Sequence, residues 1–517
     1  MTDSYTPIAA ATASGHADVG AMFHASAVAY PEHLALVDGE RLYTYAELEG
    51  RSNQLAHTLL GLGLKPGDRV AILAGNRSEY IELELAAAKT GLIVAALNWR
   101  LGRRELQHCI DLVAPQLLIF SSGKAEALDL VDTRGIARME LGADYESALA
   151  SAATSFPDHR IDPEAGLVIL YTSGTTGLPK GALISHRAMV ARALVFCTTN
   201  NIPAHDHFIA WAPMFHMAST DQALAQLMRG GTVYMVDGYQ PDRIIDIVEQ
   251  VPMQWLLLMP GMIASFCEAW RARDPKPKFI GSIGAMADLI PRHEIAEITT
   301  LLNAPFLNTF GATETGLCPA TGALIDIGST PNRLPKTQTS FCDMRLVDAD
   351  DNEVGIDTPG EVAVAGPTIF SGYWNNNETN RKDFRGGRFH MGDVLRRNAD
   401  GTLEYVDRVK YMIKSGGENI YPAEIEQVVE VDARVETAVV VRQPDDRWGE
   451  VPVLFVVPIA EQLAGRLTEA DIRTLCDENL SRYKRPRVVH FVSDADLPRS
   501  TTGKIQRHVL EERLASS

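Results

Sequence analysis

Residues 171–181 read Tyr-Thr-Ser-Gly-Thr-Thr-Gly-Leu-Pro-Lys-Gly, a run of small hydroxyl residues and glycines that ends in a lysine. An apolar run of strand type, residues 167–170, precedes this segment, and a helix that Ser185 would cap follows it. Glycines allow close backbone approach, and consecutive N–H groups and hydroxyls can surround anionic oxygens. The segment therefore predicts a polyphosphate site rather than a flexible connection. It is not a Walker A loop, because Lys180 is followed by Gly181 and the glycines are spaced differently.

Four further segments carry residues suited to phosphate, sugar or carboxylate chemistry. They are Asn-Thr-Phe-Gly-Ala-Thr-Glu-Thr-Gly at 308–316, Phe-His-Met-Gly-Asp at 389–393, Asp-Arg-Val-Lys-Tyr-Met-Ile-Lys-Ser-Gly-Gly-Glu-Asn-Ile at 407–420, and Pro-Arg-Ser-Thr-Thr-Gly-Lys-Ile at 498–505. In this order, the five segments resemble the motifs of the adenylate-forming superfamily of acyl-CoA synthetases, adenylation domains and luciferases. The resemblance covers nearly the whole chain. It implies an AMP-forming acid–thiol ligase that uses ATP, Mg²⁺ and coenzyme A.

The first half-reaction of such a ligase joins an anionic carboxylate to an anionic α-phosphate, so its barrier is largely electrostatic. The resemblance gives Lys504 the catalytic role of bridging the two anions; the alternative is a solvated surface lysine. It places Glu314 on Mg²⁺, with Thr176 as a hydroxyl partner. The alternative for Glu314 is a carboxylate favoured at the start of a helix. Thr313 would contact the α-phosphate.

The resemblance also assigns a larger set of nucleotide contacts. Phosphate contacts come from the first segment, and Asp393 with Arg408 would hold the ribose hydroxyls, unless they form only a turn and a surface ion pair. Residues 284–286 and Phe310 would flank the adenine, unless they are ordinary core. The full set is Thr172, Ser173, Gly174, Thr175, Thr176, Gly177, Lys180, Gly284, Ala285, Met286, Asn308, Thr309, Phe310, Gly311, Asp393, Tyr405 and Arg408.

The second half-reaction needs the lysine to leave and a thiol to enter, which a rotating C-terminal domain can achieve. The resemblance makes Lys410 the hinge and Lys414 a candidate for charge stabilisation in this step. Gly416 and Gly417 would line the pantetheine tunnel. An aromatic group and arginines suit the nucleotide of coenzyme A, and the candidates are Arg100, Trp448, Tyr483 and Arg485. The alternative for Trp448 is packing.

The sequence indicates the type of reaction more clearly than the identity of the carboxylic acid substrate. His216 follows Pro-Met-Phe where the family borders its acyl pocket, although a lone histidine is often a satisfied core residue. Amino-acid-activating domains have an aspartate there, which disfavours an α-amino acid. Segments expected to line the pocket are apolar or small and hold no Lys or Arg: 215–219, 256–262, 284–286 and 311–317. They predict a neutral, medium-sized aliphatic, cyclic or aromatic acid, with methionines shaping the pocket.

Three other functions compete with acyl-CoA synthesis. The enzyme could load a carrier protein, although no carrier segment follows. It could oxidise its adenylate as luciferases do, although no luciferin pocket is recognisable. It could be a silent nucleotide-binding regulator, but it retains Lys504, Glu314, Asp393 and Arg408 together. It also departs from the family at Met391, Tyr411 and Phe310, where Thr, Asp and Tyr are usual, which leaves hinge energetics and adenine contacts open.

The elements that position these residues alternate between helix and strand. Thr44 and Glu47 form a capping box for a helix, residues 70–73 and 92–97 read as strands, and residues 78–89 read as a helix. This rhythm predicts an α/β fold with parallel or mixed sheets covered by helices. Residues 340–409 predict an antiparallel subdomain. We expect an N-terminal domain, 1–409, and a small mobile α+β domain, 410–517.

The amino-acid composition limits which binding partners and which cellular location we expect for the protein. The net charge of -18 argues against a nucleic-acid or anionic-membrane surface. No apolar run reaches the length of a membrane span, and residues 1–20 make a poor signal peptide. Six scattered cysteines without a CxxC pair predict buried thiols in a reducing, cytoplasmic compartment. The expected partners are the acid, ATP and coenzyme A, and a homodimer is left open.

Overall fold

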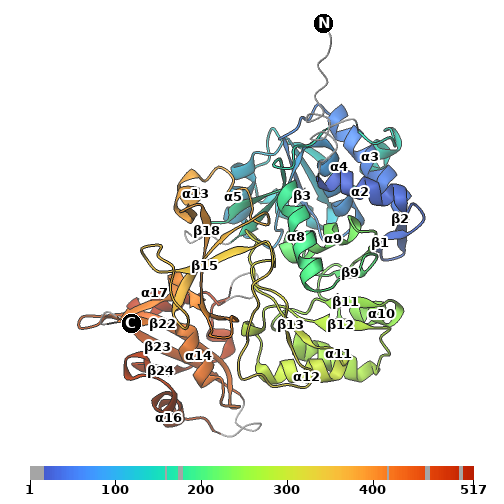
Figure 1. Cartoon of the computed structure of the whole chain (residues 1–517). Helices are drawn as coiled ribbons and strands as arrows, with labels where there is room; N and C mark the ends of the chain where they lie inside the picture. Colours follow the sequence, from blue (N-terminus) through green and yellow to red (C-terminus); the bar gives the residue numbers. More distant parts are fainter. Residues whose placement is uncertain are drawn as a thin grey trace. The chain divides into compact units, whose positions relative to one another are not determined.

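The computed structural model describes residues 17–157, 160–172, 178–415, 418–459, 466–499 and 505–516. The chain forms two compact units. The first consists of Met1–Met344 and Val364–Phe389, and the second of Arg345–Ala363 and His390–Ser517. The α/β class predicted from the sequence is confirmed by sheets of parallel strands with packed helices (Figure 1). The domain boundary between residues 409 and 410 remains a prediction.

A six-stranded sheet in the first unit has the order β6-β5-β3-β4-β7-β8. All neighbours are parallel except β7 and β8, which are antiparallel. Apolar runs form these strands because parallel strands are buried on both faces, and the strands predicted at 70–73 and 92–97 are β3 and β4. The strands are β3 (Arg69–Leu73), β4 (Ile93–Ala96), β5 (Leu117–Ser121), β6 (Ala137–Leu141), β7 (Gly166–Thr172) and β8 (Lys180–Ser185).

Two four-stranded sheets complete the larger part of the first unit. Their orders are β2-β1-β10-β9 and β11-β12-β13-β14, and each has one antiparallel strand at one edge. The first is built from β1 (Leu34–Asp38), β2 (Arg41–Thr44), β9 (His207–Ala210) and β10 (Thr232–Met235). The second is built from β11 (Met253–Leu256), β12 (Ile280–Ile283), β13 (Phe306–Asn308) and β14 (Ala323–Ile325).

Helices follow the strands of the first unit, and their capping chemistry agrees with the sequence. The Thr44–Glu47 capping box begins α3, and Ser185 accepts a hydrogen bond from the N–H of Ala188 at the start of α8. The helices are α2 (Val19–Ala29), α3 (Tyr45–Gly61), α4 (Ser78–Thr90), α5 (Arg103–Val113), α6 (Ala125–Asp129), α7 (Ala143–Ala150), α8 (His186–Thr199), α9 (Met217–Leu227), α10 (Pro241–Gln250), α11 (Ile263–Arg273), α12 (Arg292–Leu302) and α13 (Asn377–Asp383).

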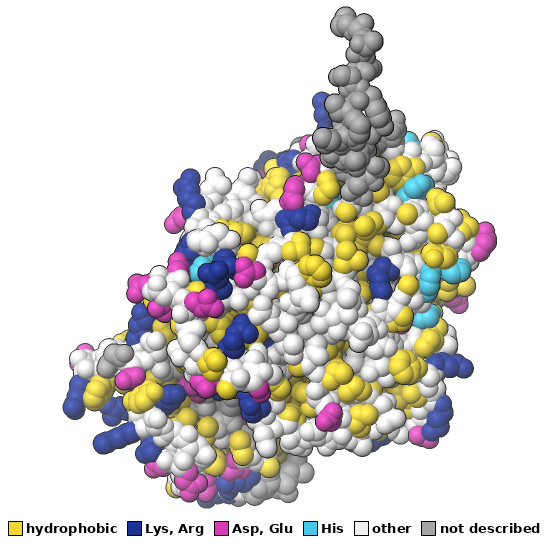
Figure 2. Space-filling model, in the orientation of Figure 1, with side chains coloured by type: hydrophobic (Ala, Val, Ile, Leu, Met, Phe, Trp, Pro, Cys, Tyr) yellow, Lys and Arg dark blue, Asp and Glu magenta, His cyan; other side chains and the backbone are white. Residues whose placement is uncertain are grey.

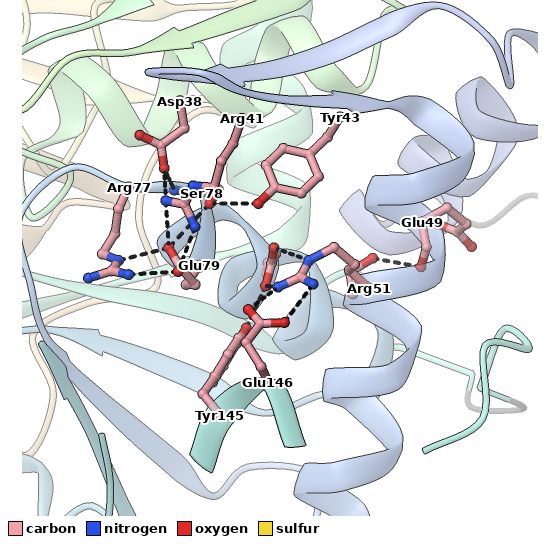
Figure 3. Close-up of polar contacts among 12 residues, drawn as sticks. Asp38, Arg41, Tyr43, Glu49, Arg51, Arg77, Ser78, Glu79, Tyr145 and Glu146 are labelled. Atoms are coloured by element: carbon pink, nitrogen blue, oxygen red, sulfur yellow. Dashed lines mark hydrogen bonds and ion pairs between the residues drawn. The ribbon is translucent and has the colours of Figure 1, made fainter. Parts of the chain in front are cut away.

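Helix α4 is buried along its whole length, and three of its four charged side chains, those of Glu79, Glu82 and Lys89, form ion pairs, as Figure 3 shows for Glu79. Arg77 and Arg41 both contact Glu79, with Arg77 Nη2 at 2.6 Å from its Oε1. Burial would raise the pKa of Glu79, but the two guanidinium groups outweigh burial and lower it to about 2. Arg51 of α3 joins Glu82 of α4 at 2.6 Å and also Glu146 of α7 at 2.7 Å. These ion pairs fix the three helices to one another.

His186, the first residue of α8, is fully buried, and its Nδ1 accepts a hydrogen bond from the N–H of Val19 at 3.3 Å. Burial lowers the pKa of His186 to about 4, below its ordinary 6.5. The unfolded chain therefore binds more protons between these values, so this stabilisation is complete above pH 6.5 and is lost as the pH falls towards 4. Between pH 7 and pH 4, the unfolding free energy of the wild type should fall about 3 kcal/mol more than that of His186→Gln. Denaturant titrations of both proteins measure this difference, and parallel pH profiles would contradict it.

A five-stranded sheet, whose strands contribute residues to both units, has the order β15-β16-β18-β17, with β19 paired to β18. Its pairs β17/β18 and β18/β19 are antiparallel, as the alternating pattern predicts. The strands are β15 (Asp343–Val347), β16 (Pro359–Ala365), β17 (Phe384–Arg385), β18 (Arg388–Arg397) and β19 (Leu403–Arg408).

The remainder of the second unit is a sheet of order β21-β20-β23-β22, with β24 beside β23 and helices packed against β22. Its core includes Ile413, Ile425, Val440 and Leu454, all of them fully buried. The elements are β20 (Ile413–Ser415), β21 (Glu418–Ile420), α14 (Pro422–Val429), β22 (Val435–Asp445), β23 (Gly449–Pro458), α16 (Glu469–Asn479), β24 (Val488–Phe491) and α17 (Arg507–Ser516). This α+β arrangement was predicted from residue 410 onward.

The burial of the cysteines agrees with the prediction made from the sequence. All six cysteines are buried and unpaired. On the face shown in Figure 2, basic and acidic side chains are interspersed. Among the residues that the structure describes, no helix is long and apolar enough to cross a membrane.

Candidate active site

The predicted phosphate-binding segment begins at the end of β7 and ends at the start of β8. Thr172 and Lys180 are paired across these antiparallel strands. Residues 173–177, which include Ser173, Gly174, Thr175, Thr176 and Gly177, lie outside the described residues. The helix that Ser185 was predicted to cap is α8, and strand β8, which was not predicted, lies between the segment and this helix. The Nζ of Lys180 lies 3.8 Å from the ring centroid of Tyr373 and 3.8 Å from Asp383 Oδ2.

The structure brings Thr172 and Glu314 together, although they are far apart in sequence. The hydroxyl of Thr172 lies 3.5 Å from Glu314 Oε1, and the hydroxyl of Tyr373 donates to the same oxygen at 2.7 Å. Glu314 is buried, and its carbonyl accepts a hydrogen bond from the N–H of Phe370. A carboxylate fixed beside the phosphate-binding segment can hold a cation there. Sequence reasoning missed Tyr373, because nothing in its local pattern signals a partner 59 residues away.

The segments predicted to flank adenine also meet. The N–H of Thr309 donates to the carbonyl of Ala285 at 3.1 Å. Asn308 accepts from the N–H of Ala287 at 3.0 Å and donates to the carbonyl of Leu334 at 3.1 Å. Asn308 is fully buried, so its amide holds the surrounding backbone in place.

Two glycines in these segments are required by close backbone approach. A Cβ on Gly284, whose φ is +146°, would lie 2.5 Å from the carbonyl oxygen of Leu307. A Cβ on Gly311 would lie 1.9 Å from the carbonyl oxygen of Gly316. Phe310 is buried, whereas Met286 and Thr313 are half-buried.

In the second unit, Asp393 of β18 and Arg408 of β19 are direct neighbours across the sheet. Arg408 Nε and Nη2 donate to the two carboxylate oxygens of Asp393 at 2.8 and 3.3 Å. Asp393 is buried, and its charge raises the pKa of Arg408, whose side chain is 40% exposed, so the ion pair is partly buried. Tyr405, on the same strand as Arg408, has a pKa raised by burial. The pair presents a fixed carboxylate and a fixed guanidinium, which suits sugar hydroxyls.

The coenzyme A candidates in the second unit have accessible side chains. Trp448 is 38% exposed and Tyr483 is 43% exposed, so simple core packing does not explain either residue. Arg485 forms an ion pair with Asp477 at 2.6 Å. The two lysines expected near the hinge, Lys410 and Lys414, are also exposed.

Arg100, the candidate in the first unit, belongs to a cationic and aromatic cluster. Its guanidinium lies 5.0 Å from the ring centroid of Trp99 and 5.9 Å from that of Phe215. Lys124 Nζ lies 3.4 Å from the centroid of Trp99. Sequence reasoning missed Lys124, because Trp99 follows β4 and Lys124 follows β5, and the two residues approach only because both strands pair with β3.

His216 is exposed, so the alternative of a satisfied core histidine is wrong. Its Nδ1 accepts a hydrogen bond from the N–H of Ala218 at 3.2 Å and caps α9. The adjoining Phe215 and Met217 are buried, as are Leu257 and Leu258 of another predicted pocket segment.

Three further predicted residues lie outside the described part of the chain. Lys504 falls within 500–504, and Gly416 and Gly417 form a second gap. Their predicted roles rest on the sequence alone.

Comparison with known proteins identifies the family. The model of the AMP-binding enzyme family matches residues 23–374, and that of the AMP-binding enzyme C-terminal domain matches residues 424–504. A feruloyl-CoA synthase from an Amycolatopsis species is 32% identical over 493 residues, which are 93% of this chain and 96% of that protein. An indoleacetate–CoA ligase from Aromatoleum aromaticum is 30% identical over 502 residues, covering 94% of this chain and 96% of that protein.

Solved structures agree in fold over the same length. A fatty acyl CoA synthetase from Mycobacterium tuberculosis has a TM-score of 0.77 and 27% identity, covering 96% of this chain and 99% of that one. ATP-bound MatB from Rhodopseudomonas palustris has a TM-score of 0.83 and 25% identity, covering 96% and 98%. The chain therefore belongs to the AMP-binding enzyme family and is an AMP-forming acid–thiol ligase of the acyl-CoA synthetase type.

Proposed function

We propose that the protein activates a neutral, medium-sized carboxylic acid with ATP and transfers the acyl group to coenzyme A. In the first step, a carboxylate oxygen attacks the α-phosphorus of ATP, forming acyl-AMP and releasing pyrophosphate. In the second step, the thiolate of coenzyme A attacks the acyl carbon and releases AMP. The contact of Thr172 with Glu314 carries this proposal, because it joins two motifs that were independently predicted to bind ATP.

The roles of the site residues are part of the proposal. Residues 172–177 and Lys180 bind the phosphates, and Thr313 contacts the α-phosphate. The segments 284–286 and 308–311 flank the adenine, and Asp393 and Arg408, with Tyr405 close by, hold the ribose. Among the described residues, the hydrogen bonds of Thr309 to Ala285 and of Arg408 to Asp393 support this, since fixed groups bind a ligand without first being ordered.

The described residues fit a bound Mg²⁺. In nucleotide sites this ion is held by one or two carboxylates together with substrate phosphates. Glu314 offers a carboxylate, and two hydroxyls, from Thr172 and Tyr373, fix one of its oxygens. We propose that Glu314, with Thr176, holds Mg²⁺ on ATP. The ion would neutralise phosphate charge there.

The acid class rests on the apolar segments beside His216 and on the relatives. The buried side chains of Met217, Leu257 and Leu258 offer no charge to a polar tail. The named relatives that activate ferulate and indoleacetate support an aromatic acid. A reducing, cytoplasmic location and a homodimer stay predictions.

Coenzyme A is proposed to meet Arg100, Trp448, Tyr483 and Arg485 through its nucleotide, and Gly416 and Gly417 through its pantetheine arm. The exposed rings of Trp448 and Tyr483 suit adenine stacking, and the guanidinium groups of Arg100 and Arg485 suit phosphate binding. Lys414 is proposed to stabilise charge in the thioester step.

The test is incubation of the purified protein with ATP, Mg²⁺, coenzyme A and a pooled panel of straight-chain, cyclic, arylacetic and cinnamic acids. Mass spectrometry then measures acyl-CoA and AMP. Acyl-CoA formation with AMP release is expected. Acyl-adenylate without thioester would instead indicate a carrier protein as the acceptor. Neither product, in a protein that binds ATP in calorimetry, would contradict the proposal for the acids tested.

Exchange of Lys410 for proline should impair thioester formation more than adenylation, because proline restricts the backbone rotation that the proposed hinge needs. Pyrophosphate release and thioester formation from supplied acyl-adenylate measure the two steps separately. Lys410→Ala, which keeps the backbone free, is the matched control. Thioester formation at the wild-type rate in Lys410→Pro would refute the hinge.

A further inference from the structure

Arg192 of α8 is a buried arginine whose side chain reaches three separate segments of the first unit. It is 2% exposed. Its Nε donates to the carbonyl of Thr368 at 2.9 Å, and its Nη2 donates to the carbonyl of Thr313 at 3.0 Å. Its Nη1 donates to Asp221 Oδ2 at 3.1 Å. One planar guanidinium thus ties α8 to α9 and to two loops.

The two carbonyls belong to the segments that hold Glu314 in place. Thr313 immediately precedes Glu314, and Thr368 lies two residues before Phe370, whose N–H donates to the Glu314 carbonyl at 2.9 Å. Tyr373, which donates to the Glu314 carboxylate, lies on the same segment as Phe370. Arg192 therefore connects the two segments that contact Glu314, one containing Thr313 and the other containing Thr368, Phe370 and Tyr373.

The aliphatic part of the Arg192 side chain and its backbone are also closely packed, by residues 316 and 318. A Cβ on Gly316, whose φ is +66°, would lie 2.8 Å from Arg192 Cδ. The thiol of Cys318 lies 3.6 Å from the Arg192 carbonyl oxygen. The segment from 313 to 318 is thus packed against Arg192 over several residues.

Asp221 offsets the energetic cost of burying the charged guanidinium of Arg192. It is 2% exposed, and burial raises its pKa while the charge of Arg192 opposes that rise. Removing one member of a buried pair leaves an uncompensated charge and is strongly destabilising. With its charge balanced by Asp221, Arg192 can commit its other two donors to neutral carbonyls.

We propose that Arg192 is a positioning residue for adenylation, which sets Thr313 and Glu314 in place for Mg²⁺·ATP without touching the nucleotide. This inference rests on the proposed function. A guanidinium is needed because three acceptors lie in three fixed directions. The ammonium of lysine is a compact charge that does not reproduce this fork.

The test uses Arg192→Lys, which keeps the charge beside Asp221. With the most reactive acid of the panel, adenylation by this variant should fall about 10²-fold, the cost of a misplaced reacting group. The Mg²⁺ concentration for half-maximal rate should rise. Thioester formation from supplied acyl-adenylate, which needs no Mg²⁺·ATP, should stay close to wild type. Pyrophosphate release, Mg²⁺ titration and thioester yield give these three values.

Arg229→Lys is the matched control, because Arg229 is a half-buried arginine of the same unit whose Nη2 also donates to a backbone carbonyl, that of Ile202 at 2.6 Å. It should retain both half-reactions. Denaturant titrations compare the stabilities of the two variants. Equal loss of both half-reactions in Arg192→Lys, or the same selective loss in Arg229→Lys, would overturn the positioning role.

Gly316→Ala provides a second route if Arg192→Lys does not fold. The added Cβ would lie 2.8 Å from Arg192 Cδ and would strain the backbone at this positive φ, while the guanidinium charge is retained, and the same selective loss of adenylation is expected. Wild-type adenylation in a folded Gly316→Ala protein would contradict the inference. Failure of the wild type to release pyrophosphate would refute the proposed function itself, whereas an active wild type with an unaltered Arg192→Lys would refute only the positioning role.

Discussion

Lys504→Ala is expected to lose adenylation by about 10³-fold while still converting supplied acyl-adenylate into thioester. In the first step two anions must approach each other, and the lysine would neutralise both as the new bond forms. In the second step the adenylate already exists, and the proposed domain rotation removes the lysine. Pyrophosphate release measures the first step, and acyl-CoA formation from synthetic adenylate measures the second.

Lys484→Ala controls for the loss of any lysine from the second unit. Lys484 forms an ion pair with Glu424 at 2.7 Å and has no proposed catalytic role. This variant should retain adenylation, the half-reaction that Lys504→Ala is expected to lose. If Lys504→Ala lost both half-reactions equally, alternation of the domain between two steps would be the wrong description.

Glu314→Gln is expected to lower adenylation by about 10²-fold and to raise the Mg²⁺ requirement. Glutamine keeps the size of the side chain and can still accept the hydrogen bond from Tyr373, but it removes the negative charge proposed to hold the cation. A Mg²⁺ titration of pyrophosphate release measures the effect. Thioester formation from supplied acyl-adenylate should change little.

Tyr373→Phe tests whether the position of the Glu314 carboxylate matters independently of its charge. It removes the hydroxyl that donates at 2.7 Å and keeps the ring beneath Lys180. A lost hydrogen bond to a charged group predicts a decrease of about tenfold, smaller than that of Glu314→Gln. An unchanged Mg²⁺ requirement in Glu314→Gln would show that this carboxylate does not hold the ion. The helix-start alternative is wrong in either case, because Glu314 lies in a turn and not at the start of a helix.

The local sequence predicted correctly those helix caps and strands that depend only on residues close together in the chain. The capping box of Thr44 and Glu47, the cap at Ser185 and the apolar strands β3 and β4 all form as predicted. Each depends on hydrogen bonds or burial within a few neighbouring residues, so the chain carries the information locally. Strand β8 was missed because its pairing with β7 is a contact between strands, which the local pattern does not signal.

Motif order determined the chemistry, and comparison with relatives confirmed the family. The motifs single out Glu314, Asp393 and Arg408 as site residues, which stays a prediction, but they do not indicate which residues hold these side chains in place. The pairing of Asp393 with Arg408 follows from antiparallel register between β18 and β19, which no local pattern specifies.

Only the tertiary structure decided which side chains support the site. Tyr373 and Arg192 reach the Thr313–Glu314 segment from elements 59 and 121 residues away in sequence. Arg192 lies in an otherwise apolar stretch of α8, where a sequence signals a buried charge but not its partners. The physical reason is that a buried polar group must find its partners wherever folding brings them, and those partners are set by packing rather than by neighbours along the chain.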